Sequence, residues 1–331
     1  MTNLYLTEQG SYLRKRGEVL VYGKDGETLL ERPLKDVGMV VLFGQVQASV
    51  QALLALLENG CDVSLLTRNG HFRGRIAPAL GKNSPLRVAQ HRLNADSSCR
   101  LEISRLIVAA KIHNGMRLLK GYHYSQTNPA RFTFIDSLVK LEKKALKAVS
   151  LDELRGCEGA AARRYYQGFR NILTSEVQFP GRKFYPSTDP VNAVLSFGYS
   201  FVARELQGLL EASGLDPYIG FFHVVEYGRT SLSLDLLEEY RHCLVDRLTL
   251  KLFNKKILNA KDFEPGQDGG MYLRRDALKV FIKHYEQTVN DPSIPYNGVL
   301  CSYRYIFREQ ADAFRKAILG NANYTPFRME K

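Results

Sequence analysis

The sequence predicts a two-domain protein. We expect a small β-rich, β-sandwich-like domain with one helix over residues 1–85 and a larger all-α domain over residues 86–331. At 331 residues the chain is long for one compact domain and comfortable for two. Short apolar segments between turn residues fill residues 1–80, whereas the apolar period after that is mostly near 3.6, as in helices. The stretch GKNSP separates the two patterns.

In the first domain, short segments rich in Val, Leu and aromatic residues are expected to be strands. They lie near residues 11–16, 18–22, 28–32, 37–43, 61–66 and 72–76. The turn GKDG (residues 23–26) joins two of them as a hairpin, because Gly and Asp tolerate positive φ. One helix interrupts the strands in VQASVQALLALLENG, where Gly60 is a natural C-terminal stop.

In the second domain, capping residues mark where helices begin. Ser150 and Glu153 form an S-x-x-E capping box, which opens a helix that contains CEGAAARRYYQGF. Another helix begins in STDPVNAVLSFGYS, with Thr188 or Asp189 as its cap and a proline just inside. A third helix is expected to start near Ser231 or Ser233 and to carry DLLEEYRHCLVDRL, and a final helix is expected in REQADAFRKAIL, with a loop in KDFEPGQDGGMY.

The charge balance indicates a polyanionic partner. Lys and Arg number 46 against 34 Asp and Glu, which gives a formal net charge of +12. This charge points to nucleic acid, with an anionic membrane surface as the weaker alternative. No stretch approaches the roughly 20 apolar residues of a membrane-spanning helix. The scattered cysteines indicate neither a disulfide framework nor a zinc cluster, which fits a reducing cytoplasm.

Acidic residues gather beside a histidine in HVVEYGRTSLSLDLLEEYR, which begins at His223. On a helix, one stripe would contain Asp235, Glu238, Glu239 and His242. Like charges at these spacings repel by roughly a few tenths of a kcal/mol per pair. Two explanations are open: a solvated face with salt bridges, or a divalent cation that offsets the acids.

A second acidic position lies in RGCEGAAARRYY, where small residues flank Glu158. Small neighbours let another backbone or a nucleic-acid strand approach that carboxylate. Arg163 and Arg164 offer cations for phosphates, and Tyr165 and Tyr166 offer rings on which bases stack. The alternatives are close helix–helix packing for the small residues and a solvated face for the arginines.

With these motifs in view, the sequence resembles the CRISPR-associated protein 1 family, the integrase that acquires new spacers. The matching blocks are CEGAAARRYYQGF, DPVNAVLSFGYS, GLDPYIGFFH, YGRTSLSLDLLEEYR and the closing REQA with YTPF, in the family's order. The residues of these blocks resemble those of the version that accompanies type I systems, subtype I-C. The resemblance implies a prokaryotic, cytoplasmic protein.

The resemblance also implies a metal site. Its ligand positions fall on Glu158, His223 and Glu238, with Asp235 as a supporting catalytic residue beside the metal. Two carboxylates and an imidazole suit Mn²⁺ well and Mg²⁺ acceptably. Arg241 matches a basic position that faces phosphate, so it joins Arg163, Arg164 and Tyr165 as an expected DNA contact. Glu239 and His242 match no ligand position.

The implied reaction is strand transfer. The 3′-hydroxyl of a short DNA fragment, the protospacer, attacks a phosphodiester of the CRISPR repeat, and without an acceptor the same site acts as a metal-dependent endonuclease. The family works as homodimers, for which the β-rich domain is the expected surface, and the small CRISPR-associated protein 2 bridges two dimers. The alternative function is a non-catalytic basic scaffold that binds nucleic acid and whose acids are only salt-bridged.

Overall fold

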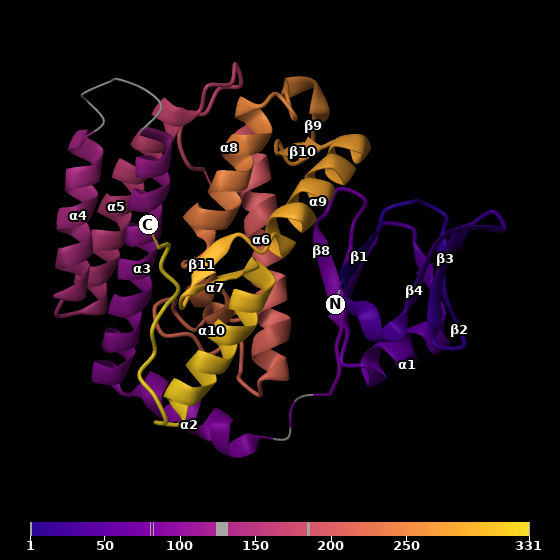
Figure 1. Ribbon diagram of the computed structural model, residues 1–331, viewed down its shortest axis with the longest axis horizontal. Helices are drawn as coiled ribbons and strands as arrows, with labels where there is room; N and C mark the ends of the chain where they lie inside the picture. Colours follow the sequence, from indigo (N-terminus) through magenta and orange to yellow (C-terminus); the bar gives the residue numbers. More distant parts are fainter. Residues whose placement is uncertain (1, 80, 82, 124–131, 184–185, 331) are drawn as a thin grey trace. The chain divides into compact units, whose positions relative to one another are not determined.

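The computed structural model describes residues 2–79, 81, 83–123, 132–183 and 186–330 (Figure 1). The chain forms two compact units. The first contains Met1–Leu80 and Leu273–Ile282, and the second contains Gly81–Tyr272 and Lys283–Lys331. The predicted order of a β-rich region followed by a helical one is confirmed. The segment Leu273–Ile282, which joins the first unit from far along the chain, was not anticipated from any sequence pattern.

Two four-stranded sheets form the first unit. One has the order β1 (Thr2–Leu6), β5 (Val37–Phe43), β7 (Asp62–Leu66), β8 (Phe72–Ile76), and the other β4 (Glu27–Pro33), β3 (Val19–Lys24), β2 (Tyr12–Arg16), β6 (Gln47–Ala48). The six predicted strands are present, and β1 and β6 are additional. β1, β5 and β7 are parallel, which the sandwich-like prediction did not foresee. Parallel pairing joins distant segments, so no local turn announces it.

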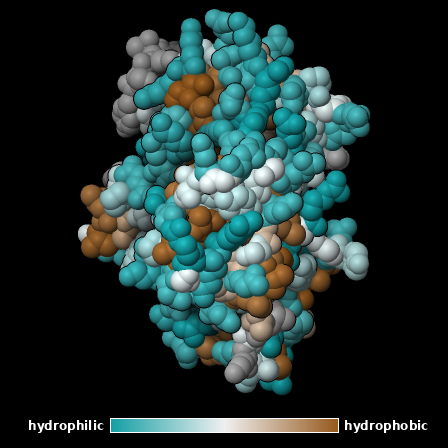
Figure 2. All heavy atoms as spheres, turned by 90° about the vertical axis from the view of Figure 1, so that its right-hand side faces the viewer, coloured by the Kyte–Doolittle hydropathy of each residue, from teal (hydrophilic) through white to brown (hydrophobic). Residues whose placement is uncertain are grey.

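One core serves both sheets. It includes Leu4 and Val40 from the first sheet and Leu13 and Leu20 from the second, together with the buried side of α1 (Val50–Glu58). The helix begins later than predicted because Gln47–Ala48 pairs with β2. The face of the molecule in Figure 2 is mostly hydrophilic with separate hydrophobic patches. In the first unit, large exposed apolar side chains include Leu29, Val50, Leu54 and Phe72.

The second unit is mainly helical. Its helices are α2 (Ser84–Ala95), α3 (Ser97–His123), α4 (Phe132–Leu146), α5 (Leu151–Ile172), α6 (Pro190–Ala212), α7 (Ser231–Leu237), α8 (Arg247–Asn254), the end of α9 (Arg275–Asn290) and α10 (Tyr303–Ile318). α3, α4 and α5 pack against one another, side by side in Figure 1. In the described part of the chain, no helix has the length and apolar character needed to cross a membrane.

The prediction of an all-α second domain is wrong in two places. β9 (Phe263–Pro265) pairs with β10 (Met271–Leu273) inside the predicted loop, and β11 (Ile294–Tyr296) pairs with β12 (Val299–Cys301). Asn297 and Gly298 connect the second pair, both with positive φ (51° and 80°). An Asn-Gly pair between apolar residues is a strong hairpin signal, so the sequence contained this information.

The predicted helix caps are present. Ser150 Oγ accepts a hydrogen bond from the Glu153 amide at 3.2 Å, and the Glu153 carboxylate accepts one from the Val149 amide at 2.9 Å. Asp189 accepts from the Asn192 amide at 2.9 Å and opens α6. These contacts satisfy amides that a helix start leaves without partners, and they fix where α5 and α6 begin.

The expected helix over residues 235–248 is interrupted. α7 ends at Leu237, and Arg241–Asp246 forms a π-helical segment before α8. Such wide turns change the direction in which successive side chains point and often occur at functional sites. The predicted acidic stripe therefore does not exist. Asp235, Glu238, Glu239 and His242 are all at least 98% buried, so the solvated-face explanation is wrong.

Candidate functional site

Three distant parts of the second unit meet at a pair of carboxylates. Glu158 lies in α5, Glu238 follows α7, and His223 lies in the connector before α7. Lys111 of α3 lies between the carboxylates, with its Nζ 2.6 Å from Glu158 Oε1 and 2.5 Å from Glu238 Oε2. His223 Nε2 is 3.7 Å from Glu238 Oε1. The structure thus joins the two predicted carboxylate ligands through one ammonium group and places the predicted histidine beside one of them.

Asp235 positions the histidine. Its Oδ1 accepts a hydrogen bond from the His223 amide at 2.8 Å and lies 2.7 Å from His223 Nδ1. Its Oδ2 accepts from the amides of Phe221 and Phe222. Gly220 makes this approach possible, since a Cβ there would lie 2.8 Å from Asp235 Oδ2. With Nδ1 held by a carboxylate, Nε2 is the nitrogen that faces Glu238, which is the arrangement of metal-binding histidines.

Cations keep Glu238 ionised although it is buried. Arg241 Nε donates to its Oε1 at 2.8 Å. Burial opposes the charge, but Arg241, Lys111 and His223 together hold the pKa of Glu238 well below its ordinary value. For Lys111, burial is likewise outweighed by Glu238 and Glu158, and its pKa is raised above the ordinary lysine value. The group is therefore a network of paired charges inside the protein.

Arg241 is held within the site from two sides. Its guanidinium lies 4.5 Å from the centre of the Tyr199 ring, and its Nε donates to Glu238. Its contact with phosphate stays a prediction. Arg163 and Arg164 lie on the exposed side of α5, as a DNA contact would require.

The prediction that Tyr165 stacks on DNA bases is wrong. This side chain is 1% exposed, its hydroxyl donates to Asp246 Oδ2 at 2.7 Å, and its ring lies 3.7 Å from the His242 ring, centre to centre. It stands four residues after Ala161 and four before Phe169, on the buried face of α5. The sequence letters Arg-Arg-Tyr therefore span the boundary between an exposed and a buried face.

A second polar cluster lies beside the first. Asp246 accepts from the hydroxyls of Tyr165 and Tyr199 and lies 2.7 Å from His242 Nδ1. Glu239 accepts from the Tyr324 hydroxyl and from the Phe327 amide. Burial raises the pKa of Glu239 to about 8 despite these hydrogen bonds. This cluster holds together the helices and the C-terminal residues through neutral donors.

Lys111 was missed by sequence reasoning, yet a signal was present. It stands in the apolar run LIVAAKI of α3, where a charge is seldom buried without a partner. Only the fold shows that the partner is a pair of carboxylates. A small cavity of about 10 Å³ borders Lys111, Glu158, Tyr165 and His242.

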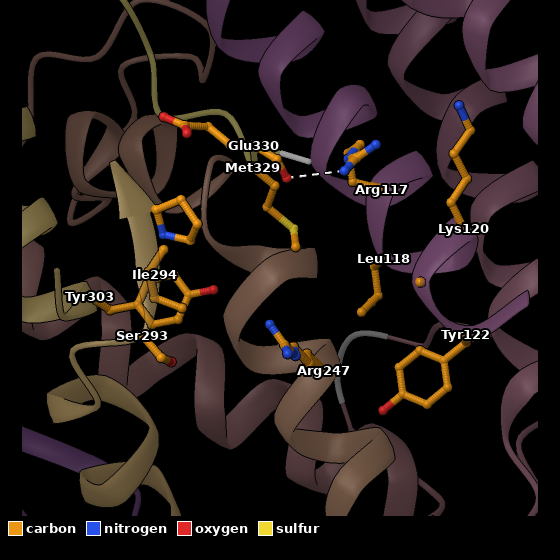
Figure 3. Close-up of a pocket in the computed structure, with 12 residues that line it drawn as sticks. Arg117, Leu118, Lys120, Tyr122, Arg247, Ser293, Ile294, Tyr303, Met329 and Glu330 are labelled. Carbon is orange, nitrogen blue, oxygen red and sulfur yellow. Dashed lines mark hydrogen bonds between the residues drawn. The ribbon is translucent and has the colours of Figure 1, made fainter. Parts of the chain in front are cut away.

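A basic pocket in the same unit was also missed. It has a volume of about 590 Å³, and Figure 3 shows Arg117 and Lys120 of α3 and Arg247 at the start of α8 around it. Arg117 donates to the backbone oxygen of Glu330 at 3.1 Å. Tyr303 and several apolar side chains also line the pocket. Its cations come from elements far apart in sequence, so no local charge run reveals it.

The residues that could take part in binding a divalent metal are two carboxylates and an imidazole, and the Lys111 ammonium bridges the carboxylates. Within the described residues, no three His, Cys, Asp or Glu side chains are close enough to form a complete metal site. Glu238 Oε2 is nevertheless a buried acceptor without a well-aligned hydrogen bond, although Lys111 Nζ is only 2.5 Å away. Two carboxylates that share one cation, with an oriented imidazole beside them, match the oxygen and nitrogen ligands that Mn²⁺ takes.

Comparisons with known proteins agree with this architecture. Residues 4–287 match the family model described as CRISPR associated protein Cas1. A CRISPR-associated endonuclease Cas1 from Thermus thermophilus is 33% identical over 328 residues, which cover 98% of this chain and 96% of that protein. The solved structure of a CAS1 protein from Thermotoga maritima has a TM-score of 0.84 at 26% identity, with complete coverage of both chains.

Two further solved structures share the fold at lower identity. One is a casposase bound to integration product (TM-score 0.84, 21% identity, 98% of this chain and 93% of that one). The other is a chain of a Cas6-RT-Cas1–Cas2 complex (TM-score 0.82, 22% identity, all of this chain and 36% of that one). Subtype I-C stays a prediction. The family model and the relatives lead to one conclusion: this chain belongs to the CRISPR-associated protein Cas1 family.

Proposed function

We propose that this protein is a metal-dependent DNA integrase of CRISPR adaptation, which also cleaves DNA when no proper acceptor is present. One observation supports the proposal: Glu158 and Glu238 share the Lys111 ammonium, His223 Nε2 lies 3.7 Å from Glu238, and Asp235 orients the histidine. In strand transfer, a 3′-hydroxyl oxygen bonds to a phosphorus of the repeat while the bond from that phosphorus to the strand's own 3′-oxygen breaks.

Glu158, Glu238 and His223 would hold Mn²⁺ or Mg²⁺. A bound ion would neutralise the charge that develops at the phosphate and orient the attacking hydroxyl. The chain's own residues prepare the site. Asp235 keeps His223 Nε2 directed at Glu238, and Arg241 keeps Glu238 ionised at neutral pH. Burial of Glu238 limits competition by water for its oxygen atoms, whereas Glu158 is partly exposed.

DNA is the proposed substrate, in the form of a protospacer fragment and the CRISPR repeat. The net charge of +12, the exposed Arg163 and Arg164 and the pocket with Arg117 and Arg247 support binding of phosphates. The casposase structure supports the same substrate class, since its chain shares this fold while bound to an integration product.

The proposed assembly is a homodimer, two of which the small CRISPR-associated protein 2 bridges. A chain of this fold occurs in a Cas6-RT-Cas1–Cas2 complex, which supports the partner. Exposed apolar side chains of the first unit, among them Leu29 and Phe72, support the β-rich region as the dimer surface. A cytoplasmic location in a prokaryote remains part of the proposal.

The experiment that tests the function uses purified protein, its small partner, a labelled short duplex and a supercoiled repeat plasmid, with Mn²⁺ or EDTA. We expect Glu158→Gln to lower strand transfer by about a hundredfold or more, because one carboxylate of the cation site is lost. Asp152→Asn is the matched control, since Asp152 lies on the same helix with its side chain 91% exposed. Strand transfer by Glu158→Gln at the wild-type rate would refute the proposal.

A specific observation also favours the alternative, a non-catalytic scaffold that binds nucleic acid. Lys111 and Arg241 pair with the acids, as that alternative requires. The scaffold predicts equal behaviour in Mn²⁺ and EDTA and DNA binding that does not change when His223 is replaced. The integrase predicts product only with the metal, so the same assay separates the two.

A further inference from the structure

Lys111 holds the position that a metal ion would need. Its ammonium contacts Glu158 and Glu238, which come from two different elements and are the two predicted carboxylate ligands. The lysine side chain is 11% exposed, and those of Glu158 and Glu238 are 22% and 3% exposed. A salt bridge this buried depends on its partners for compensation. The ammonium and a divalent ion therefore compete for the same oxygen atoms.

The ammonium and a divalent ion cannot both bind the same carboxylate oxygens. Lys111 Nζ lies 2.6 Å from Glu158 Oε1 and 2.5 Å from Glu238 Oε2, so an ion that binds both oxygens would need the place that the ammonium occupies. Mg²⁺ keeps several of its waters when it binds, and a nearby ammonium also repels it. An ion that takes Glu158 and Glu238 as ligands must therefore displace Lys111 Nζ.

The backbone of α3 cannot make this displacement. One turn after Lys111, Gly115 lies so close to its neighbours that a Cβ would be 2.8 Å from His242 Cδ2 and 3.0 Å from Tyr165 Cδ2. α3 therefore packs directly against the second polar cluster at this point. The lysine ammonium sits on a flexible four-carbon chain, so the side chain is the part that can move.

Arg241, the other cation of the site, is held more firmly. Its Nε donates to Glu238 Oε1, and its guanidinium also lies over the Tyr199 ring at 4.5 Å. Lys111 makes ion pairs with the two carboxylates. Of the two cations, Lys111 is therefore the exchangeable one.

We propose that Lys111 is an internal counter-ion that occupies the metal position in the metal-free protein and leaves it when the divalent ion binds. This inference rests on the proposed metal site and adds that Lys111 weakens metal affinity while it stabilises the metal-free fold. Its role is thus to position the carboxylates and to set the metal concentration at which the site is loaded.

The test is a Mn²⁺ titration of the full-length, metal-free protein by calorimetry, without DNA. We expect Lys111→Met to bind Mn²⁺ at least about tenfold more tightly than wild type, because the competing cation is gone. Lys120→Met is the control, since Lys120 lies on the same helix but lines the other pocket, and its affinity should equal that of wild type. Equal or weaker Mn²⁺ binding by Lys111→Met would overturn the proposal.

Thermal unfolding supplies a second readout. Metal-free Lys111→Met should melt below wild type, and saturating Mn²⁺ should restore its melting temperature, because the ion replaces the lost cation. A deficit that Mn²⁺ leaves unchanged would show a purely structural lysine. If Lys111→Met does not fold, Lys111→Gln serves the same comparison with a neutral side chain that still donates hydrogen bonds.

The outcomes also separate this inference from the proposed function. If Lys111→Met binds Mn²⁺ more tightly but the wild-type protein transfers no strands, the counter-ion role of Lys111 is supported and the proposed integrase function is refuted. If the wild-type protein transfers strands with the metal but Lys111→Met binds Mn²⁺ with unchanged affinity, the integrase function is supported and the counter-ion role of Lys111 is refuted.

Discussion

Two buried clusters of acids lie next to each other in the second unit, and they are compensated in different ways. In the first, cations neutralise the charge: Lys111 and Arg241 bind Glu238. In the second, no cation binds the acid through these contacts; uncharged donors, the Tyr324 hydroxyl and the Phe327 amide, hydrogen-bond Glu239. Glu238 and Glu239 are sequence neighbours, yet the pKa of Glu238 is lowered and that of Glu239 is raised to about 8.

This difference separates a ligand site from a structural one. An acid that is kept ionised among exchangeable cations can bind a metal ion. An acid that is buried among hydroxyls and amides favours its neutral form and holds packed elements together. Burial alone does not distinguish the two, since Glu238 and Glu239 are 2% and 0% exposed. The identity of the hydrogen-bond donors does.

The largest effect is expected from replacing each of the two neighbouring glutamates in turn. Glu238→Gln should lower Mn²⁺-dependent strand transfer by about a hundredfold or more, because it removes a carboxylate from the cation site. Glu239→Gln should stay within a few-fold of wild type, since Tyr324 and Phe327 can bond an amide. Rates of strand transfer at saturating Mn²⁺ measure the effect. Equal decreases in the two variants would show that Glu238 and Glu239 do not differ in role.

The next effect concerns stability and the second cluster. Asp246→Asn should lower the free energy of unfolding by about 2–3 kcal/mol, because Tyr165, Tyr199 and His242 share the lost charge. Urea denaturation measures it, with the exposed Asp152→Asn as control. Mn²⁺ affinity should be that of wild type, and a large change would mean that the two clusters are coupled.

A third and less buried acid, Glu142, should give the smallest effect. Glu142 accepts from Arg328 at 2.9 Å and lies 3.6 Å from His113 Nδ1. Burial works against its charge, but His113 and Arg328 hold its pKa below the ordinary 4.5. Its contribution is therefore present above that value and is lost as the pH falls through the lowered pKa in the folded protein.

We expect wild type to lose about 1 kcal/mol of stability from this site on acidification from near pH 5, since Arg328 is partly exposed and solvent screens the pair. Glu142→Gln should lack this part of the pH dependence while it matches wild type in strand transfer at neutral pH. Urea denaturation at a series of pH values measures both proteins. A pH dependence of the same size in the variant would assign the effect to other acids.

Local sequence determined where many elements begin. Ser150 and Asp189 cap α5 and α6 as predicted, because a cap depends only on residues three positions away. The Asn297-Gly298 turn was equally local, although the all-α prediction overlooked it. The conjunction of Glu158, His223 and Glu238 followed from resemblance to a family, and the chain's own periodicity would have grouped Glu239 and His242 with them.

Only the tertiary structure decided which buried groups face one another. Glu238 and Glu239 lie in the turn between α7 and the π-helical segment Arg241–Asp246 and face different partners, and the packing of α3 against α5 brings Lys111 to Glu158 across 47 positions. The same packing buries Tyr165. Capping and periodicity reflect interactions within a few residues, whereas the charge state of a buried acid depends on donors that only folding brings near it.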